Sequence, residues 1–191
     1  MAHTGLVLDE GEEQIEFLAT AADTDGALVR CRVRVTPGRP APPEHSHPAQ
    51  EETFRVEAGR LGYKLGAETR EVGPGEVAVV PPGTNHTFWN AGSEPLVMVA
   101  DVRPALRFED FTETIHVLIR DGKLNPGGKR ANPLLLAVVA DEFRREWRLT
   151  NLSPVARSLL PALAFMGRRA GLRGHYRADG KAATRAAASR V

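Results

Sequence analysis

The residues best suited to chemistry in this sequence are histidines that lie close together and near carboxylates. His45 and His47 are separated by one residue, and on an extended backbone that spacing puts both imidazoles on one face. Imidazole nitrogens are common ligands of divalent transition metals. The pair therefore indicates one part of a candidate metal site.

Two adjacent glutamates compete for the next ligand position. Glu52 alternates with Phe54 and Val56, whereas Glu51 belongs to the polar set of the same strand. A face that holds Phe and Val is the interior, so Glu52 points inward and Glu51 points toward water. A lone carboxylate on an apolar face is costly unless a cation compensates its charge. Glu52 is therefore the predicted carboxylate ligand.

A third histidine lies on a second apolar-lined face, where His86 alternates with Phe88 and Asn90. Any one of these histidines alone would be better explained as a satisfied polar or surface side chain. Three imidazoles and a carboxylate that converge inside a β-barrel are typical of a transition-metal site. Four protein ligands in an octahedral sphere leave about two positions open, as catalytic sites do. The predicted ligands are His45, His47, Glu52 and His86.

Glycine and proline recur at fixed distances from these residues. The first stretch reads Gly38-x6-His45-x-His47-x4-Glu52-x6-Gly59, and the second reads Gly75-x5-Pro81-x-Gly83-x2-His86-x3-Asn90. This pattern closely resembles the two signature motifs of the cupin family, over about residues 27–105. One departure is the six residues, rather than the family's usual five, between Gly38 and His45, which we interpret as a longer turn. It leaves the candidate ligands undisturbed.

The resemblance implies a mainly β fold, namely a single cupin-like antiparallel β-barrel (jelly roll). It also implies that the same four residues bind one divalent transition metal, without deciding among Fe, Mn, Zn, Ni and Cu. Affinity for such metals rises toward copper at almost any N/O site, so the ligands alone do not identify the ion. The motif glycines Gly59, Gly75 and Gly83 are expected in turns that need unusual backbone angles.

The resemblance does not select one activity, because cupin-like proteins with this ligand set include dioxygenases, isomerases and members that catalyse nothing. The predicted pocket contains Phe54, Val56, Phe88 and Asn90, and its apolar character favours a small organic substrate with a chelating group. We expect an oxygenase-type or related metalloenzyme, a dioxygenase or isomerase, in which Glu52 doubles as a catalytic proton acceptor. The alternative is a non-catalytic, metal-assisted module that binds or senses a small molecule.

These side chains must be positioned by short strands separated by glycine and proline clusters, which is typical of a sandwich or barrel. Residues 27–35 alternate cleanly, with arginines on one face and Val29, Cys31, Val33 and Val35 on the other. Cys31 is expected to be an inert core residue. Further strands are predicted at 52–57, 61–65, 76–80, 86–90 and 96–103.

After Pro104 the hydrophobic period changes to three and four residues, which predicts C-terminal α-helices. The predicted helices are one from Phe108 that stops at Asp121-Gly122, one that opens at Asn132-Pro133 and continues through Trp147, and one that begins at Ser153-Pro154. Pro161 is expected to kink or split the third helix.

These elements divide the chain into three predicted parts. Residues 1–105 form the cupin-like barrel with an N-terminal extension, 106–176 form a helical extension packed on the barrel or on a partner subunit, and 177–191 form a disordered tail. Residues 1–143 carry 14 Lys and Arg against 22 Asp and Glu, whereas residues 144–191 carry 11 against 2. Because these charges are complementary, we expect a homodimer.

A basic amphipathic helix can also lie on an anionic membrane surface, but packing within the protein is the favoured interpretation. No nucleic-acid partner is expected, because the arginines lack interleaved aromatic side chains. The single cysteine excludes an intramolecular disulfide, and acidic residues near the N-terminus interrupt the apolar run of a signal peptide. The expected location is cytoplasmic.

Overall fold

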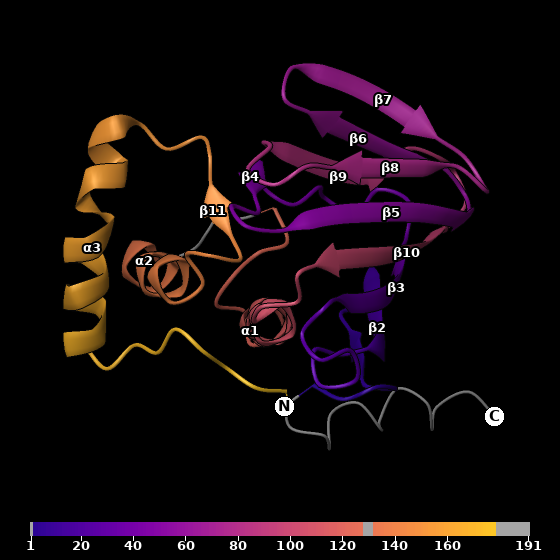
Figure 1. The fold of residues 1–191 in the computed structure, drawn as a ribbon. Helices are drawn as coiled ribbons and strands as arrows, with labels where there is room; N and C mark the ends of the chain where they lie inside the picture. Colours follow the sequence, from indigo (N-terminus) through magenta and orange to yellow (C-terminus); the bar gives the residue numbers. More distant parts are fainter. Residues whose placement is uncertain (1, 128–131, 179–191) are drawn as a thin grey trace.

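The computed structural model describes residues 2–127 and 132–178, which form two antiparallel β-sheets with three helices at one side (Figure 1). The larger sheet has the order β1 (Val7–Asp9), β2 (Glu13–Ala19), β3 (Val29–Val35), β10 (Leu96–Arg103), β5 (Glu51–Ala58) and β8 (Val77–Val80). The smaller sheet has the order β11 (Arg148–Leu149), β4 (His45–Ser46), β9 (His86–Asn90), β6 (Leu61–Leu65) and β7 (Glu68–Val72).

The two sheets are not closed into the barrel that the sequence suggested. Within the described part of the chain, the strand pairing forms two separate ladders, and the sheets are joined by side-chain packing. Their shared core takes Phe54 and Val56 from the larger sheet and Leu61 and Tyr63 from the smaller one. The mainly β, cupin-like jelly roll with C-terminal helices is confirmed, whereas a continuous hydrogen-bonded barrel is wrong.

Alternation along β3 agrees with the sequence pattern. Val29, Cys31, Val33 and Val35 are buried, while the three intervening arginines are exposed. The strand joins β2 on one side and β10 on the other. β2 was not predicted, although the alternation of Ile15 and Phe17 with polar residues is a usable signal. It widens the larger sheet and places Glu13 in the protein interior.

A tight turn after β5 depends on glycine. Gly59 has a φ of 77°, and a Cβ added there would lie 2.6 Å from the carbonyl oxygen of Pro95 and 2.8 Å from Cα of Leu96. Both the backbone angle and the lack of space therefore require glycine. Gly75 and Gly83 also have positive φ, at 85° and 74°, as expected for turn residues.

The helices are α1 (Phe108–Arg120), α2 (Pro133–Glu142) and α3 (Pro154–Arg169). Asn132 and Ser153 cap the last two, each accepting hydrogen bonds from backbone N–H groups of the first turn. α2 ends at Glu142 and not near Trp147, because the chain turns there and pairs as β11 with β4. α3 continues through Pro161 without the predicted split. This side chain is exposed, and proline removes only one helical hydrogen bond.

α3 packs on α2 and not on the sheets (Figure 1). The helices approach closely at Gly167, where a Cβ would lie 2.6 Å from Cγ2 of Val138. Arg168 pairs with Asp141 at 2.6 Å, so part of the basic charge is neutralised within the chain.

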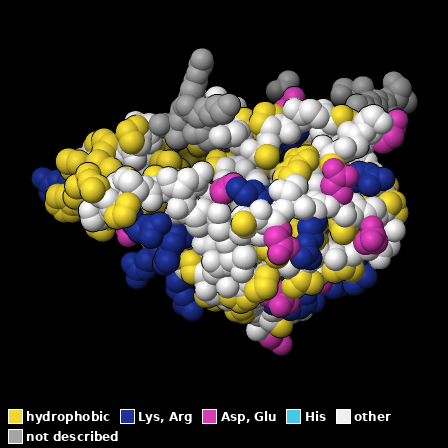
Figure 2. Space-filling model, turned by 90° about the horizontal axis from the view of Figure 1, so that it is seen from above, with side chains coloured by type: hydrophobic (Ala, Val, Ile, Leu, Met, Phe, Trp, Pro, Cys, Tyr) yellow, Lys and Arg dark blue, Asp and Glu magenta, His cyan; other side chains and the backbone are white. Residues whose placement is uncertain are grey.

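The outer face of α3 exposes both apolar and basic side chains (Figure 2). The exposed apolar side chains are Val155, Leu159, Phe165 and Met166. None of the described helices is both long and apolar enough to span a membrane.

Candidate metal centre

Three predicted ligands come together between the sheets. His45 begins β4 and pairs in register with His86 at the start of β9, and His47 follows β4 directly. All three are buried, and one potential ligand atom from each lies within 4.8 Å of the others. Among the described residues, this is the group of His, Cys, Asp and Glu side chains whose spacing could hold a metal ion.

Hydrogen bonds fix the orientation of each imidazole. The Nδ1 atom of every histidine in the group lies within hydrogen-bond distance of a backbone carbonyl oxygen. The acceptors for His45, His47 and His86 are Pro43 at 2.8 Å, Glu146 at 2.5 Å and Thr84 at 3.0 Å. Because a carbonyl oxygen only accepts, each Nδ1 carries the hydrogen, and the neutral ring leaves its Nε2 lone pair free for a metal.

Glu52 lies beside this cluster, on the inward face of β5. Its Oε2 is 3.1 Å from Nε2 of His86 and 3.5 Å from Nε2 of His47. Burial raises the pKa of the Glu52 carboxyl, but His47 and His86 together lower it below its ordinary value. Burial is the largest single influence on the pKa of His47 and lowers it, but the charge of Glu52 and the hydrogen bonds to Glu52 and Glu146 together raise this pKa above its ordinary value. Burial and the two neighbouring imidazoles lower the pKa of His45 to about 3, so this ring stays neutral.

The donor set fits a divalent transition metal. The Nε2 lone pairs converge beside a buried carboxylate oxygen, and such an arrangement of acceptors is unfavourable unless a cation lies among them. A single proton placed between His47 and Glu52 would satisfy only those two side chains, whereas a divalent ion would satisfy all four together. Mixed imidazole and carboxylate donors suit iron, manganese, zinc, nickel or copper. His45, His47, Glu52 and His86 are the residues that would hold it.

The helical extension completes the surroundings of the histidines. The Glu146 carbonyl anchors His47, and β11 pairs with β4 in the register Leu149 to His45. The Trp147 ring lies 6.3 Å from the ring of His45. The sequence predicted only that the helical extension is helical and basic. It gave no signal that the residues around Trp147 would lie against the histidines. The contact depends on tertiary packing between parts of the chain about a hundred residues apart.

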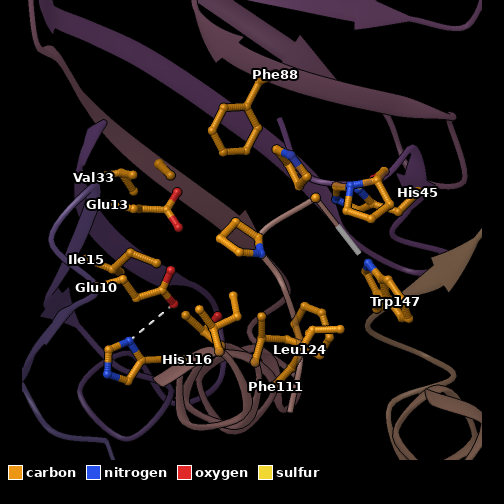
Figure 3. Close-up of a pocket in the computed structure, with 18 of the residues that line it drawn as sticks. Glu10, Glu13, Ile15, Val33, His45, Phe88, Phe111, His116, Leu124 and Trp147 are labelled. Atoms are coloured by element: carbon orange, nitrogen blue, oxygen red, sulfur yellow. Dashed lines mark hydrogen bonds and ion pairs between the residues drawn. The ribbon is translucent and has the colours of Figure 1, made fainter. Parts of the chain in front are cut away.

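A cavity of about 430 Å³ adjoins the cluster. Its lining is mostly apolar and comes from both sheets and from the helical extension (Figure 3). Phe54 and Phe88 lie in this lining, as the proposed pocket requires. Val56 packs in the core between the sheets, and Asn90 bonds the carbonyls of Val35 and Glu94, so neither belongs to the cavity lining.

A second polar group lies across the cavity from His45 (Figure 3). Nη2 of Arg39 contacts Glu13 at 2.5 Å and Glu10 at 3.4 Å, and Nδ1 of His116 lies 3.4 Å from Glu10. All four side chains are about nine-tenths buried. We call these four residues the distal polar group. Sequence reasoning missed it, because its members come from separate elements and only folding brings them together.

The two facing antiparallel sheets and the internal histidine cluster define a jelly-roll protein with a candidate metal centre. Residues 31–101 match the family model described as "Cupin domain". This segment, rather more than a third of the chain, is therefore similar to cupin domains.

A curated relative and several solved structures are similar to parts of the chain. "Probable oxidoreductase virH" from Hypocrea virens is 38% identical over 79 residues, which cover 40% of this chain and 36% of that protein. The match thus spans about a third of the relative's length. A Klebsiella pneumoniae protein described as having a double-stranded β-helix domain is 25% identical, with a TM-score of 0.45 over 51% of this chain and 82% of that one. A predicted oxalate decarboxylase from Thermotoga maritima is 21% identical, with a TM-score of 0.46 over 49% and 82%.

Proposed function

We propose that this chain is a metal-dependent enzyme of the oxygenase or a related type, acting on a small organic molecule. His45, His47, Glu52 and His86 hold one divalent transition metal. The observation that supports this most strongly is the hydrogen-bonded orientation of the three imidazoles, each with Nδ1 bound to a backbone carbonyl. Such anchoring by outer partners is the usual support of histidine ligands.

The cavity supports a small, largely apolar substrate. Phe54 and Phe88 pack together, with ring centroids 5.3 Å apart, in the wall near the histidines. When bound, the metal supplies Lewis-acid or oxygen-activating chemistry. The apolar walls exclude water and orient the substrate, while Trp147 and Phe108 enclose the histidine end. Glu52 accepts a proton at its carboxylate, which lies within reach of two imidazoles.

The name of the Hypocrea virens relative supports an oxidoreductase over an isomerase or a binding protein. The match at 38% identity extends over 79 residues, about the length of the cupin segment. The candidate ligands lie within residues 31–101, the segment that matches the family model.

Oxygen uptake tests the enzyme proposal. Protein reconstituted anaerobically with Fe(II) or Mn(II) is mixed with small 1,3-diketones and catechols, which offer two oxygens to one metal, and dioxygen is followed with an electrode. Wild type should consume oxygen together with one of these compounds, and His47→Ala should not. The His3→Ala variant is the matched control, because His3 is an exposed histidine far along the chain from the cluster. Equal uptake by wild type and His47→Ala would reject the proposal.

A metal-assisted binding or sensing module is the second candidate function. Trp147 and Phe108 lie beside the histidines and are compatible with it as well, because a ligand enclosed by these rings is bound whether or not it reacts. The same experiment separates the two functions when the compounds are analysed afterwards. Metal-dependent binding with the compound recovered unchanged would support the sensor and exclude the enzyme for that compound.

A further inference from the structure

The distal polar group has an internal imbalance of charge and hydrogen bonding. One guanidinium, that of Arg39, contacts both buried carboxylates, those of Glu10 and Glu13, and the His116 imidazole contacts Glu10 as well. Burial raises the pKa of Glu13 to about 7, against the lowering effect of Arg39. At neutral pH this carboxyl is therefore protonated for part of the time, and the charges of Arg39 and Glu10 then balance.

Arg39 supplies an independent indication of a missing partner. The residue is 8% exposed and lies in the cavity lining, yet its buried Nε has no hydrogen-bond partner among the described residues. Its Nη atoms are engaged with Pro40, Glu10 and Glu13. A buried donor without an acceptor is costly, so a small shift of the Arg39 side chain toward an acceptor in the cavity would be favourable.

The chemistry of this end of the cavity excludes simple charged groups. A carboxylate could accept from Arg39 but would be repelled by Glu10 and Glu13. An ammonium could donate to the glutamates but would leave Nε of Arg39 without an acceptor. A hydroxyl or a carboxamide does both, because it donates one hydrogen bond and accepts another.

Building on the proposed function, we propose that the distal polar group is a specificity subsite for the end of the substrate remote from the metal. It recognises an uncharged hydroxyl or carboxamide through Glu13, Glu10 and Arg39. The substrate class is then an elongated molecule with a metal-chelating group at one end, an apolar middle against Ile15, Val33 and Phe111, and a neutral polar group at the other (Figure 3).

Binding of a matched series of simple probes tests the subsite separately from the metal. Affinities for 1-octanol, octanoate and octylamine are measured by calorimetry on the full chain, as purified and again after EDTA treatment. In the EDTA-treated protein, where no metal can hold the carboxylate of octanoate, wild type should bind 1-octanol at least tenfold more tightly than either charged analogue. Because the EDTA-treated protein holds no metal to which a probe could bind, this result does not depend on the proposed metal centre.

Variants assign the preference to the distal polar group. Glu13→Leu should weaken 1-octanol binding about tenfold, and Glu16→Gln, on the same strand but at the surface, should leave it unchanged. Glu13→Leu removes the shortest ion pair of Arg39 and leaves it only the longer contact with Glu10 and the bond to the Pro40 carbonyl, which can destabilise the chain. The double variant Glu13→Leu/Arg39→Met removes the guanidinium as well, and Glu10 keeps its contact with His116. This double variant should stay folded by circular dichroism and lose the preference for the alcohol.

Three results would overturn the subsite: no binding of 1-octanol to wild type, equal binding of octanoate or octylamine to the EDTA-treated wild type, or unchanged 1-octanol affinity in the folded double variant. If the protein binds no metal at the histidines but the EDTA-treated protein still prefers 1-octanol, the proposed function is refuted and the subsite is not.

Discussion

At the scale of single residues, the interior of this protein holds charge at two places, and each place has a different form of compensation. Around His47, imidazole nitrogens and the Glu52 carboxylate lie close together, and a cation among them would stabilise this arrangement. Around Glu13 a guanidinium is already present, but it is shared with Glu10. The identity of the inward carboxylate at position 52 could be predicted from alternation alone, because Phe54 and Val56 mark the buried face. The distal polar group could not, because no local pattern links Glu10, Glu13, Arg39 and His116.

Glu13 should make the stability of the protein depend on pH in a defined direction. Its pKa is about 7 in the folded protein and about 4.5 ordinarily, so between these values the folded state binds more protons than the unfolded state. The stabilising contribution is present below pH 4.5 and is lost as pH rises through 7. Relative to Glu13→Gln, wild type should lose at most on the order of 3 kcal/mol of unfolding free energy over this window.

Urea denaturation of wild type and Glu13→Gln at several pH values between about 4 and 8 checks this. The difference between the two proteins isolates Glu13 from other titrating groups. A difference that stays constant with pH would show that Glu13 titrates normally in the folded protein.

At the scale of elements, alternation and turn chemistry indicated the strands that carry the ligands. β3, β5, β6, β8, β9 and β10 lie within two residues of their predicted bounds. β1, β2, β4, β7 and β11 were not predicted. Of these, β4 and β11 are two residues long, and they form by pairing with each other and, for β4, with β9. A segment so short has no periodicity to detect, and that is why the return of the helical extension to His45 was not predicted.

The turn after β5 should be intolerant of any side chain. Gly59→Ala adds a methyl group 2.6 Å from the Pro95 carbonyl oxygen and forces alanine into positive φ. We expect a loss of about 3 kcal/mol of unfolding free energy. Gly66→Ala is the matched control, with a φ of 60° and open space around its Cβ, and should cost only ~1 kcal/mol. Equal losses in the two variants, measured by chemical denaturation, would argue against the close approach at Gly59.

At the scale of the whole molecule, the sheets and the helical extension enclose one cavity between the histidines and the distal polar group. The sequence predicted the sheets and the helices separately, but which face the helices cover is a property of the assembled chain. The homodimer remains a prediction, and so do the proposed domain boundaries. The predicted disordered tail lies outside the described residues from position 179 onward.

Metal binding should stabilise the whole fold. A ligand that binds only the folded state adds about 4 kcal/mol to the unfolding free energy at a free concentration a thousandfold above its Kd. EDTA should therefore lower the thermal midpoint of wild type, and added Mn(II) or Fe(II) should restore it. His47→Ala should show neither response, while His3→Ala should behave as wild type. Identical responses to EDTA in wild type and His47→Ala would place the metal elsewhere.

The most direct measurement is elemental analysis of protein purified without a histidine tag or chelator, made on wild type, Glu52→Gln, His86→Ala and the control His3→Ala. The proposed centre predicts close to one transition-metal ion per chain in wild type and in the control, and loss of that metal in the other two. A wild type that contains no metal and takes none up on addition, or variants that retain it, would contradict a metal centre at His45, His47, Glu52 and His86.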